Sequence, residues 1–287
     1  MRILSWLALG ASLATTVSSS QAASFASAVT DYNPGALRSN IASYTNASSV
    51  IGEPSRVTPG TYGGPVDPFS PPYLDSQLLA VGTNGTLTVQ LGVPAINSPS
   101  NPYGVDFIIF GGAGFSITNG DFSGGGITDG SIFNPRPGAV RISVSPDNQT
   151  FYTLDSSLAP VFDKLYPTDG SGDFAQPVNP ALKDSDFGGK NLAGIRALYA
   201  GSAGGTGYDL DWAIDNHGQK VQLDSVQFVR IDVLDGYYEI DGFATVSPVP
   251  EPATSALLVS GLCLLGWRMK KREREYGPHV EPIRNIS

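Results

Sequence analysis

The first candidates for chemistry in this 287-residue chain are acidic side chains between positions 209 and 241. The seven acids are Asp209, Asp211, Asp215, Asp232, Asp235, Glu239 and Asp241. Calcium takes about six to eight oxygen ligands in a flexible arrangement, which loops supply well. Because the spacing of an EF-hand loop is missing, two interpretations of these acids stay open. They supply a calcium site whose ligands come from loops, or they form a solvated acidic surface with aspartates that cap loops.

Aromatic side chains in or beside expected loops form a second set of candidates. They are Tyr62, Phe69, Tyr73, Tyr103, Tyr199, Tyr208, Trp212, Tyr237 and Tyr238. An aromatic face can stack on a sugar ring while neighbouring acids and amides bind its hydroxyls. The alternative is that these rings close the ends of a hydrophobic core, as we expect for Trp212. As candidate ligand-binding residues we take Tyr103, Tyr208, Tyr237 and Tyr238.

Enzyme chemistry has fewer starting points. His217 is the only histidine outside the terminal segments, and the turn-like Asn216-His217-Gly218 predicts an exposed loop residue. The Gly-x-Ser-x-Gly pattern of many serine hydrolases is absent. The glycine runs at 111–114 and 124–126 lack the lysine of a phosphate-binding loop. We therefore predict no enzyme and no catalytic residue, although paired carboxylates leave a glycoside hydrolase open as an alternative.

Charge and cysteine content exclude further classes. Residues 24–250 hold ten basic and 22 acidic residues, a net charge of −12. This charge repels phosphate backbones, so we expect no nucleic-acid partner. The single cysteine, Cys263, lies in a terminal apolar segment. A disulfide framework, a cysteine nucleophile and a cysteine zinc cluster are therefore not expected in residues 24–250.

Three features follow one another near the end of the sequence. Pro250-Glu251-Pro252 precedes an apolar segment at 253–267, and a basic cluster follows it. The basic residues that complete the pattern are Arg268, Lys270, Lys271 and Arg272. The prolines favour an extended, accessible motif. The apolar segment is shorter than the about 20 residues of a durable transmembrane helix, and the basic cluster predicts a cytoplasmic end.

This order of features, over 249–272, resembles the PEP-CTERM sorting domain of exported bacterial proteins. The resemblance implies recognition and cleavage by an exosortase-like enzyme in Gram-negative bacteria that make extracellular polysaccharide. It also implies a transient anchor in the inner membrane and delivery to the cell surface or extracellular matrix. We assign 248–274 to the sorting signal, with a short transmembrane helix, and 275–287 to a polar tail. A simple tail anchor is the alternative.

The beginning of the sequence agrees with export. Arg2 precedes the apolar stretch 3–17, and small residues follow up to Ala23. This pattern predicts a secretory signal peptide at 1–23. The remaining body, 24–247, has a length that suits one all-β domain.

Short β-branched segments between glycines and prolines predict an all-β body. We expect strands at 86–91, 105–110 and 139–144, and a hairpin partner at 151–154. The apolar run at 105–110 indicates burial on both faces. The spans 54–74, 111–137 and 160–207 are expected to be long surface loops.

A further strand is expected at 226–233. Leu234-Asp235-Gly236 reads as a tight turn into a closing strand at 238–246. Within that strand, Gly242 indicates a β-bulge. Two packed sheets can bury one face of each strand, so we predict an antiparallel β-sandwich of jelly-roll type.

The last two expected strands resemble those of galactose-binding-like and discoidin-like β-sandwiches. The resemblance implies a structural calcium ion that ties the first loop to the closing strand. Its ligands would come from Asp31 or Asn33 and from Glu239 or Asp241, the residues that we take as the candidate calcium site.

Three functions follow from these patterns. We favour a noncatalytic exported protein of the cell surface or extracellular matrix that binds or organises polysaccharide. The alternatives are a carbohydrate-active hydrolase that uses two carboxylates, and a purely structural surface protein without a small ligand.

Overall fold

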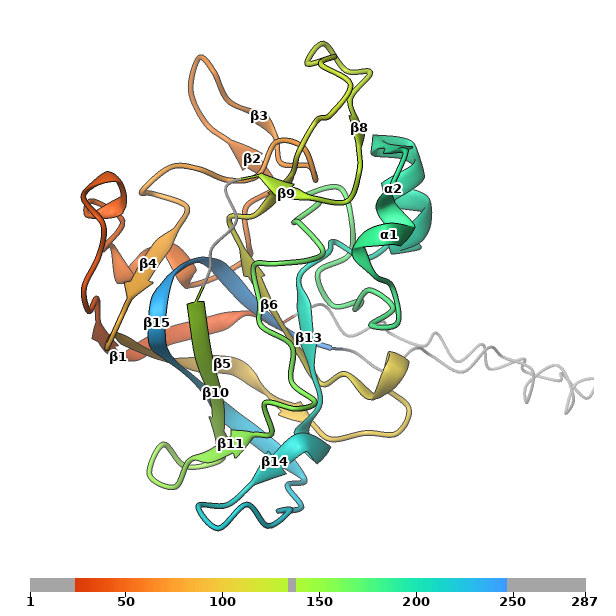
Figure 1. Cartoon of the computed structure of the whole chain (residues 1–287). Helices are drawn as coiled ribbons and strands as arrows, with labels where there is room; N and C mark the ends of the chain where they lie inside the picture. Colours follow the sequence, from red (N-terminus) through yellow and green to blue (C-terminus); the bar gives the residue numbers. More distant parts are fainter. Residues whose placement is uncertain (1–23, 134–137, 247–287) are drawn as a thin grey trace, which may run out of the picture. The chain divides into compact units, whose positions relative to one another are not determined.

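The computed structural model describes residues 24–133 and 138–246 as an all-β body (Figure 1). Nine strands form its antiparallel framework. They are β1 (Ala26–Asn33), β4 (Leu79–Gly82), β5 (Thr86–Ile96), β6 (Phe107–Gly111), β10 (Gly138–Ser145), β11 (Tyr152–Leu154), β13 (Thr206–Tyr208), β14 (Ala213–Ile214) and β15 (Ser225–Thr245). The strands that we predicted around 86–91, 105–110, 139–144 and 151–154 are all present.

The 21-residue strand β15 belongs to two parts of the sheet. Its first half lies between β5 and β10, in the order β1-β5-β15-β10-β11-β14. Its second half pairs with β4 and β6, and β13 extends that part beside β6. The main hydrophobic core draws on both parts, with Val89 and Ile231 from the first and Ile109 and Phe243 from the second. This arrangement is sandwich-like, and the jelly-roll connectivity stays a prediction.

Strand β6 is buried along its whole length, as its apolar sequence predicted. Phe107 and Ile109 contribute to the main core, whereas Ile108 and Phe110 contribute to a smaller cluster with Phe174. A strand covered on both faces needs apolar residues at every position, because neither face meets water.

The predicted turn at Leu234-Asp235-Gly236 is wrong, because β15 continues through it. Ala139 pairs with Asp235 and Val140 with Val233, so Leu234 is an extra residue in the ladder. Gly236 then takes a φ of +77°, which suits glycine. The polar and glycine residues that indicated a turn therefore form a bulge where β15 passes from one part of the sheet to the other.

A second bulge confirms the prediction at Gly242. Ile240 pairs with Gly111 and Gly242 pairs with Phe110, which makes Asp241 the extra residue. Consequently Ile240 and Phe243 both face the main core although they are three positions apart.

The long loops contain more structure than we expected. They hold three pairs of short strands and two helices. The strand pairs are β2 (Val57–Thr58) with β3 (Gly64–Pro65), β7 (Gly114–Phe115) with β9 (Ile132–Phe133), and β8 (Ile127–Thr128) with β12 (Lys190–Asn191); the helices are α1 (Asp184–Phe187) and α2 (Leu192–Tyr199). Short 3-10 turns lie at η1 (Ser39–Ile41), η2 (Ala47–Val50), η3 (Pro102–Gly104) and η4 (Leu210–Trp212).

These loops also bury a hydrophobic cluster of their own. Its buried members are Phe115, Tyr166, Val178, Phe187, Ile195 and Tyr199. Asp169 forms an ion pair with Arg196 of α2 at 2.6 Å, which ties the helix to the preceding loop. The loop segments that carry β7, α1 and α2 therefore pack against one another through this cluster.

The terminal predictions fall outside this description. The signal peptide at 1–23, the sorting helix within 248–274 and the tail at 275–287 all lie beyond the described residues. Among the residues that are described, the structure contains no helix with the length and apolar character needed to span a bilayer.

Candidate functional site

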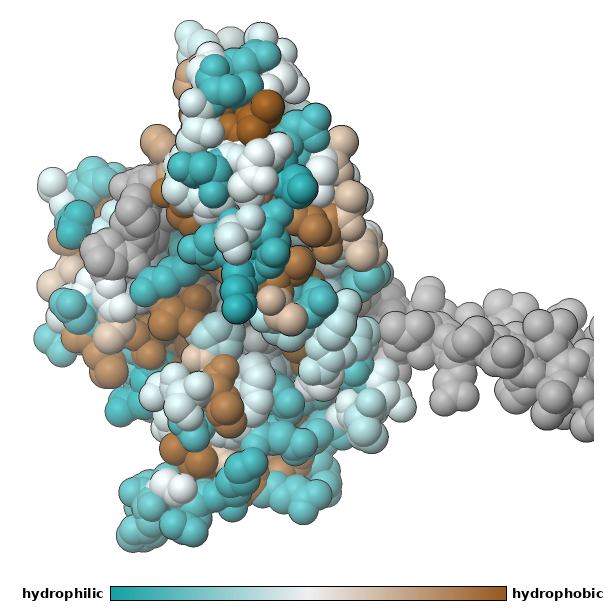
Figure 2. Space-filling model, turned by 45° about the vertical axis from the view of Figure 1, so that its right-hand side comes forward, coloured by the Kyte–Doolittle hydropathy of each residue, from teal (hydrophilic) through white to brown (hydrophobic). Residues whose placement is uncertain are grey.

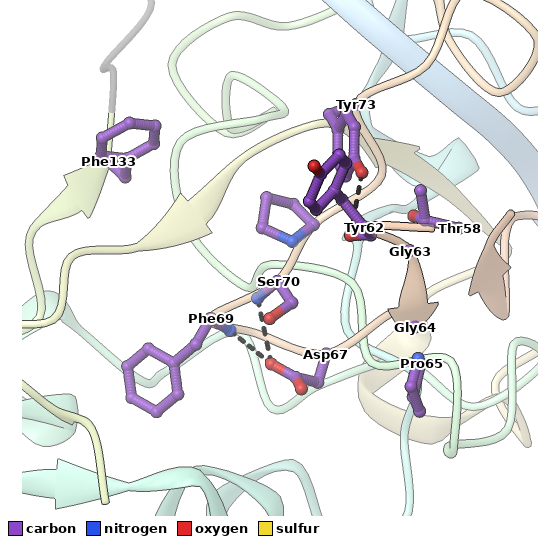
Figure 3. A pocket seen from close by; sticks show the side chains of 11 residues that line it. Thr58, Tyr62, Gly63, Gly64, Pro65, Asp67, Phe69, Ser70, Tyr73 and Phe133 are labelled. Carbon is purple, nitrogen blue, oxygen red and sulfur yellow. Dashed lines mark hydrogen bonds between the residues drawn. The ribbon is translucent and has the colours of Figure 1, made fainter. Parts of the chain in front are cut away.

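A hollow of about 580 Å³ opens among the loops at the β2–β3 hairpin (Figure 3). Its described lining residues are Thr58, Tyr62, Gly63, Gly64, Pro65, Asp67, Phe69, Ser70, Pro71, Tyr73 and Phe133. The volume falls within the roughly 300–1,000 Å³ that is usual for small-molecule sites. Aromatic rings and small polar groups dominate the lining, which is the composition expected for a surface that accepts an amphipathic ligand.

Three rings of this hollow are largely open to solvent. The exposed fraction is 92% for Tyr62, 66% for Phe133 and 45% for Tyr73. Figure 3 places Phe133 on one side of the view and Tyr62 with Tyr73 on the other. Phe69 differs, because it is partly buried and packs against the cluster around Phe187. Three of the four aromatic residues are thus accessible from solvent, and the fourth packs inward against the loop cluster.

A tight hairpin positions Tyr62. Strands β2 and β3 pair Val57 with Pro65 and Thr58 with Gly64. A Cβ atom at Gly63 would lie 1.9 Å from the carbonyl oxygen of Thr58, so only glycine permits this close approach. The hydroxyl of Tyr73 donates to the carbonyl oxygen of Tyr62 at 3.1 Å and links the hairpin to the following turn.

Asp67 forms that following turn. One oxygen of its carboxylate accepts hydrogen bonds from the backbone N–H groups of Phe69 at 2.8 Å and Ser70 at 3.0 Å. The carboxylate therefore holds the chain in a turn, a common role of aspartate.

Phe133 lies 60 positions after Tyr73, and the pairing of its strand β9 with β7 brings it to the same hollow. The N–H of Phe115 donates to the carbonyl oxygen of Pro68 at 2.7 Å, so β7 lies against the Asp67 turn. Gly114, beside it, pairs with Phe133 of β9. The hollow thus depends on a contact between two loops that are far apart in the sequence.

A buried carboxylate fastens the hollow's hairpin to the framework. Asp241, the extra residue of the β15 bulge, is 3% exposed and accepts from the Ser55 hydroxyl at 2.6 Å and the Ser55 N–H at 2.9 Å. Burial raises the pKa of Asp241 to about 7, against the lowering effect of these two bonds. The next residue, Arg56, donates to the carbonyl oxygen of Gly170 at 2.6 Å and lies over the ring of Phe174.

Three of the four tyrosines predicted to bind a ligand are core residues. Tyr208 is buried, stacks on Phe107 and donates its hydroxyl to the carbonyl oxygen of Pro160. Tyr237 and Tyr238 are also buried, at 3% and 0% exposure. Their positions on strands with both faces covered give them a packing role, which corrects the prediction. Only Tyr103 is exposed, at 57%, and it does not line the aromatic hollow.

The four residues predicted to bind calcium are engaged separately. Asp31 accepts from the Thr86 hydroxyl at 2.9 Å, and Asn33 accepts from the N–H of Gly35 at 3.1 Å. Glu239 and Asp241 are buried in the second half of β15. Within residues 24–133 and 138–246, no three histidine, cysteine or acidic residues gather closely enough to hold a metal ion. These side chains therefore do not fit the shared site that the resemblance implies, and a structural role for calcium stays a prediction.

Two of the other candidate acids, Asp209 and Asp211, border a separate, polar hollow of about 310 Å³. Asp209, Asp211 and Asp224 line it, and the Asn97 side chain donates to Asp211 at 2.7 Å. Asp215 instead caps a turn by accepting from the N–H groups of His217 and Gln219. His217 is exposed, as predicted.

The sequence pointed to only part of the aromatic hollow. Tyr62, Phe69 and Tyr73 were among the candidate loop aromatics, but their shared location was not predicted. Phe133 was missed, since a phenylalanine next to an isoleucine in a long loop gives no signal that separates a ligand contact from a core contact. Figure 2 shows that hydrophobic side chains reach the surface among hydrophilic ones over the upper part of the body.

Comparison with known proteins identifies the end of the chain. Residues 248–272 match the PEP-CTERM protein-sorting motif. This match includes all of Pro250, Glu251, Pro252, Arg268, Lys270, Lys271 and Arg272, which lie outside the described residues. No curated protein matches the chain significantly. The motif makes this an exported protein that is transiently anchored in the membrane and processed by an exosortase-type enzyme.

Proposed function

We propose that this protein is a noncatalytic protein of the cell surface or extracellular matrix that binds or organises polysaccharide through the aromatic hollow. The observation that carries the proposal is the exposure of Tyr62, Tyr73 and Phe133 around one hollow. Contact between an apolar ring surface and water is unfavourable. A ligand with apolar ring faces covers that surface and so offsets the cost. Sugar rings have such faces, and export by an exosortase-type system supports an encounter with extracellular polysaccharide.

The lining of the hollow supports binding rather than hydrolysis. Glycoside hydrolysis uses two carboxyl groups, about 5–10 Å apart, on either side of the bond that breaks. Among the described lining residues only Asp67 has a carboxylate, and one of its oxygens accepts two backbone hydrogen bonds. The hydrolase alternative therefore finds no pair of acids among the described lining residues of this hollow.

Co-sedimentation of the full-length protein, solubilised in mild detergent, with extracellular polysaccharide from the producing bacterium tests the proposal. We expect binding by the parent and strongly reduced binding by the double variant Tyr62→Ala/Phe133→Ala. Tyr103→Ala is the matched control, since Tyr103 is also an exposed tyrosine but lies outside the hollow. Absence of binding by the parent, or equal binding by the double variant, would overturn the proposal.

A further inference from the structure

We infer that the hollow is built for uncharged sugars, so that its ligand is a neutral polysaccharide and not a polymer of uronic acids or of amino sugars. This inference rests on the proposed function and names the class of ligand. It follows from the charge, the ring faces and the hydrogen-bonding groups of the lining.

The charges around the hollow disfavour an anionic ligand. Among the described lining residues there is no lysine or arginine, and the only charged residue is Asp67. Residues 24–250 carry a net charge of −12, so the surrounding field also repels anions. A uronate carboxylate that enters this hollow would lose water without gaining a cationic partner among the described lining residues, which is unfavourable.

The charged groups of the lining also give little stabilisation to a bound cationic sugar. Asp67 directs one carboxylate oxygen to the N–H groups of Phe69 and Ser70, which keeps this group within its own turn. An amino sugar would be attracted by the acidic body as a whole, but attraction of that kind is screened by salt and does not depend on the hollow.

The ring faces suit a ligand that binds by stacking. The Tyr73 hydroxyl is bonded to the backbone of Tyr62, which fixes the ring relative to the hairpin and leaves its face as the contact surface. Phe133 has only a ring face to offer. Ser70, which is exposed, adds a hydroxyl group to the lining that can donate to or accept from sugar hydroxyls. A stacking surface edged by a neutral hydroxyl matches a neutral pyranose.

Calorimetry of the full-length protein in mild detergent with defined polymers tests the inference. The probes are a soluble β-glucan and a galactomannan as neutral polymers, alginate as a uronate polymer and chitosan fragments as an amino-sugar polymer. We expect at least one neutral polymer to bind, with affinity unchanged at about 1 M salt, where the Debye length is about 3 Å. We expect Tyr62→Ala and Phe133→Ala each to weaken that binding by about three- to tenfold.

The charged polymers give the opposing outcomes. Alginate is expected to bind at least about tenfold more weakly, and chitosan only at low salt and equally in parent and Phe133→Ala. Tighter binding of alginate or chitosan than of neutral polymers, lost in Phe133→Ala, would overturn the ligand class and leave the proposed function standing. If no defined polymer and no native polysaccharide binds, both fail.

Discussion

Two buried aspartates show how the same side chain takes different roles according to its hydrogen-bond partners. Among the described residues, Asp241 accepts hydrogen bonds from Ser55, whose hydroxyl can either donate or accept. Asp106 accepts from Asn101, from the N–H of Leu210 and from the N–H of Ser98, all of which are donors. Burial raises the pKa of Asp241 to about 7 and that of Asp106 to about 6. The hydrogen-bonding groups around each aspartate therefore decide which of the two aspartates tolerates replacement by a neutral side chain.

Replacing Asp241 by asparagine is predicted to remove a pH dependence of stability. The folded carboxyl has a pKa of about 7 and the ordinary value is 3.8, so between these values the folded state binds more protons. The free energy of unfolding of the parent should therefore fall as pH rises from about 4 to about 7. Asparagine does not titrate and can still accept from the Ser55 N–H and donate to its hydroxyl. Urea unfolding at pH values across this window should show a smaller slope for Asp241→Asn, and equal or greater stability above it.

Asp147→Asn is the matched control for this experiment. Its exposed carboxylate accepts from the N–H groups of Thr150 and Gln149, which lowers its pKa. The stability that it contributes is present above its ordinary pKa and is lost as pH falls through the lowered value, so the slope above about pH 4 should not change. An unchanged slope in Asp241→Asn would contradict the assignment of this pH dependence to Asp241.

Removing Asp106 is predicted to destabilise the protein. In Asp106→Ala, the side chain of Asn101 and the N–H of Leu210 lose their acceptor in a buried place. Buried unpaired donors cost about 1–3 kcal/mol each, so we expect a loss of about 3 kcal/mol at neutral pH in urea unfolding. Asp75→Ala, at an exposed turn, is the control and should change stability by less than about 0.5 kcal/mol. A loss as small as that of the control would show that the Asp106 contacts contribute little.

At the scale of elements, the β2–β3 hairpin gives the hollow its wall. It contains only two paired positions, so its shape depends on the close approach at Gly63 and on the bond from Ser55 to Asp241. Two-residue strands are not stable alone and need such support from the rest of the protein.

Gly63→Ala is therefore predicted to abolish polysaccharide binding while the framework stays folded. The new methyl group would overlap the carbonyl oxygen of Thr58 and force the hairpin open, but the main core contains no residue of this hairpin. We expect loss of binding in co-sedimentation with a thermal unfolding midpoint close to that of the parent. Gly188→Ala is the control, because its Cβ would meet backbone oxygens no closer than 3.3 Å. If Gly63→Ala retained binding, the shape of the hairpin would not be needed for the binding site.

Elements formed by local alternation were predictable from the sequence, and those formed by contacts between distant segments were not. Strand β6 and the β10–β11 hairpin were expected, because apolar runs and a short polar turn determine them locally. The path of β15 was misread at Gly236, since a glycine with positive φ serves a bulge as well as a turn. The cluster around Phe187 joins residues of three separate loop spans, so no local sequence pattern predicts it.

The same distinction explains the candidate site. Tyr208 and Tyr238 were predicted to contact a ligand because they lie in or beside expected loops, yet their strands are covered on both faces. The residues that do line the hollow are brought together by the bond from Phe115 to Pro68, a contact that a single sequence does not reveal.

At the scale of the whole molecule, the sorting motif decides where the hollow would meet the proposed ligand. The match to residues 248–272 was visible in the sequence because a linear motif is read directly by its enzyme and needs no folded context.

We predict that Pro250→Ala/Glu251→Ala/Pro252→Ala blocks processing, since an extended, proline-defined motif is what the exosortase-type enzyme reads. The variant should remain in the membrane fraction at its unprocessed size on immunoblots, while the parent is released. Glu281→Ala/Pro282→Ala alters a similar Glu-Pro pair outside the motif and should be processed like the parent. Release of the motif variant at the processed size would mean that another segment directs sorting, and the encounter with extracellular polysaccharide would then need a different route.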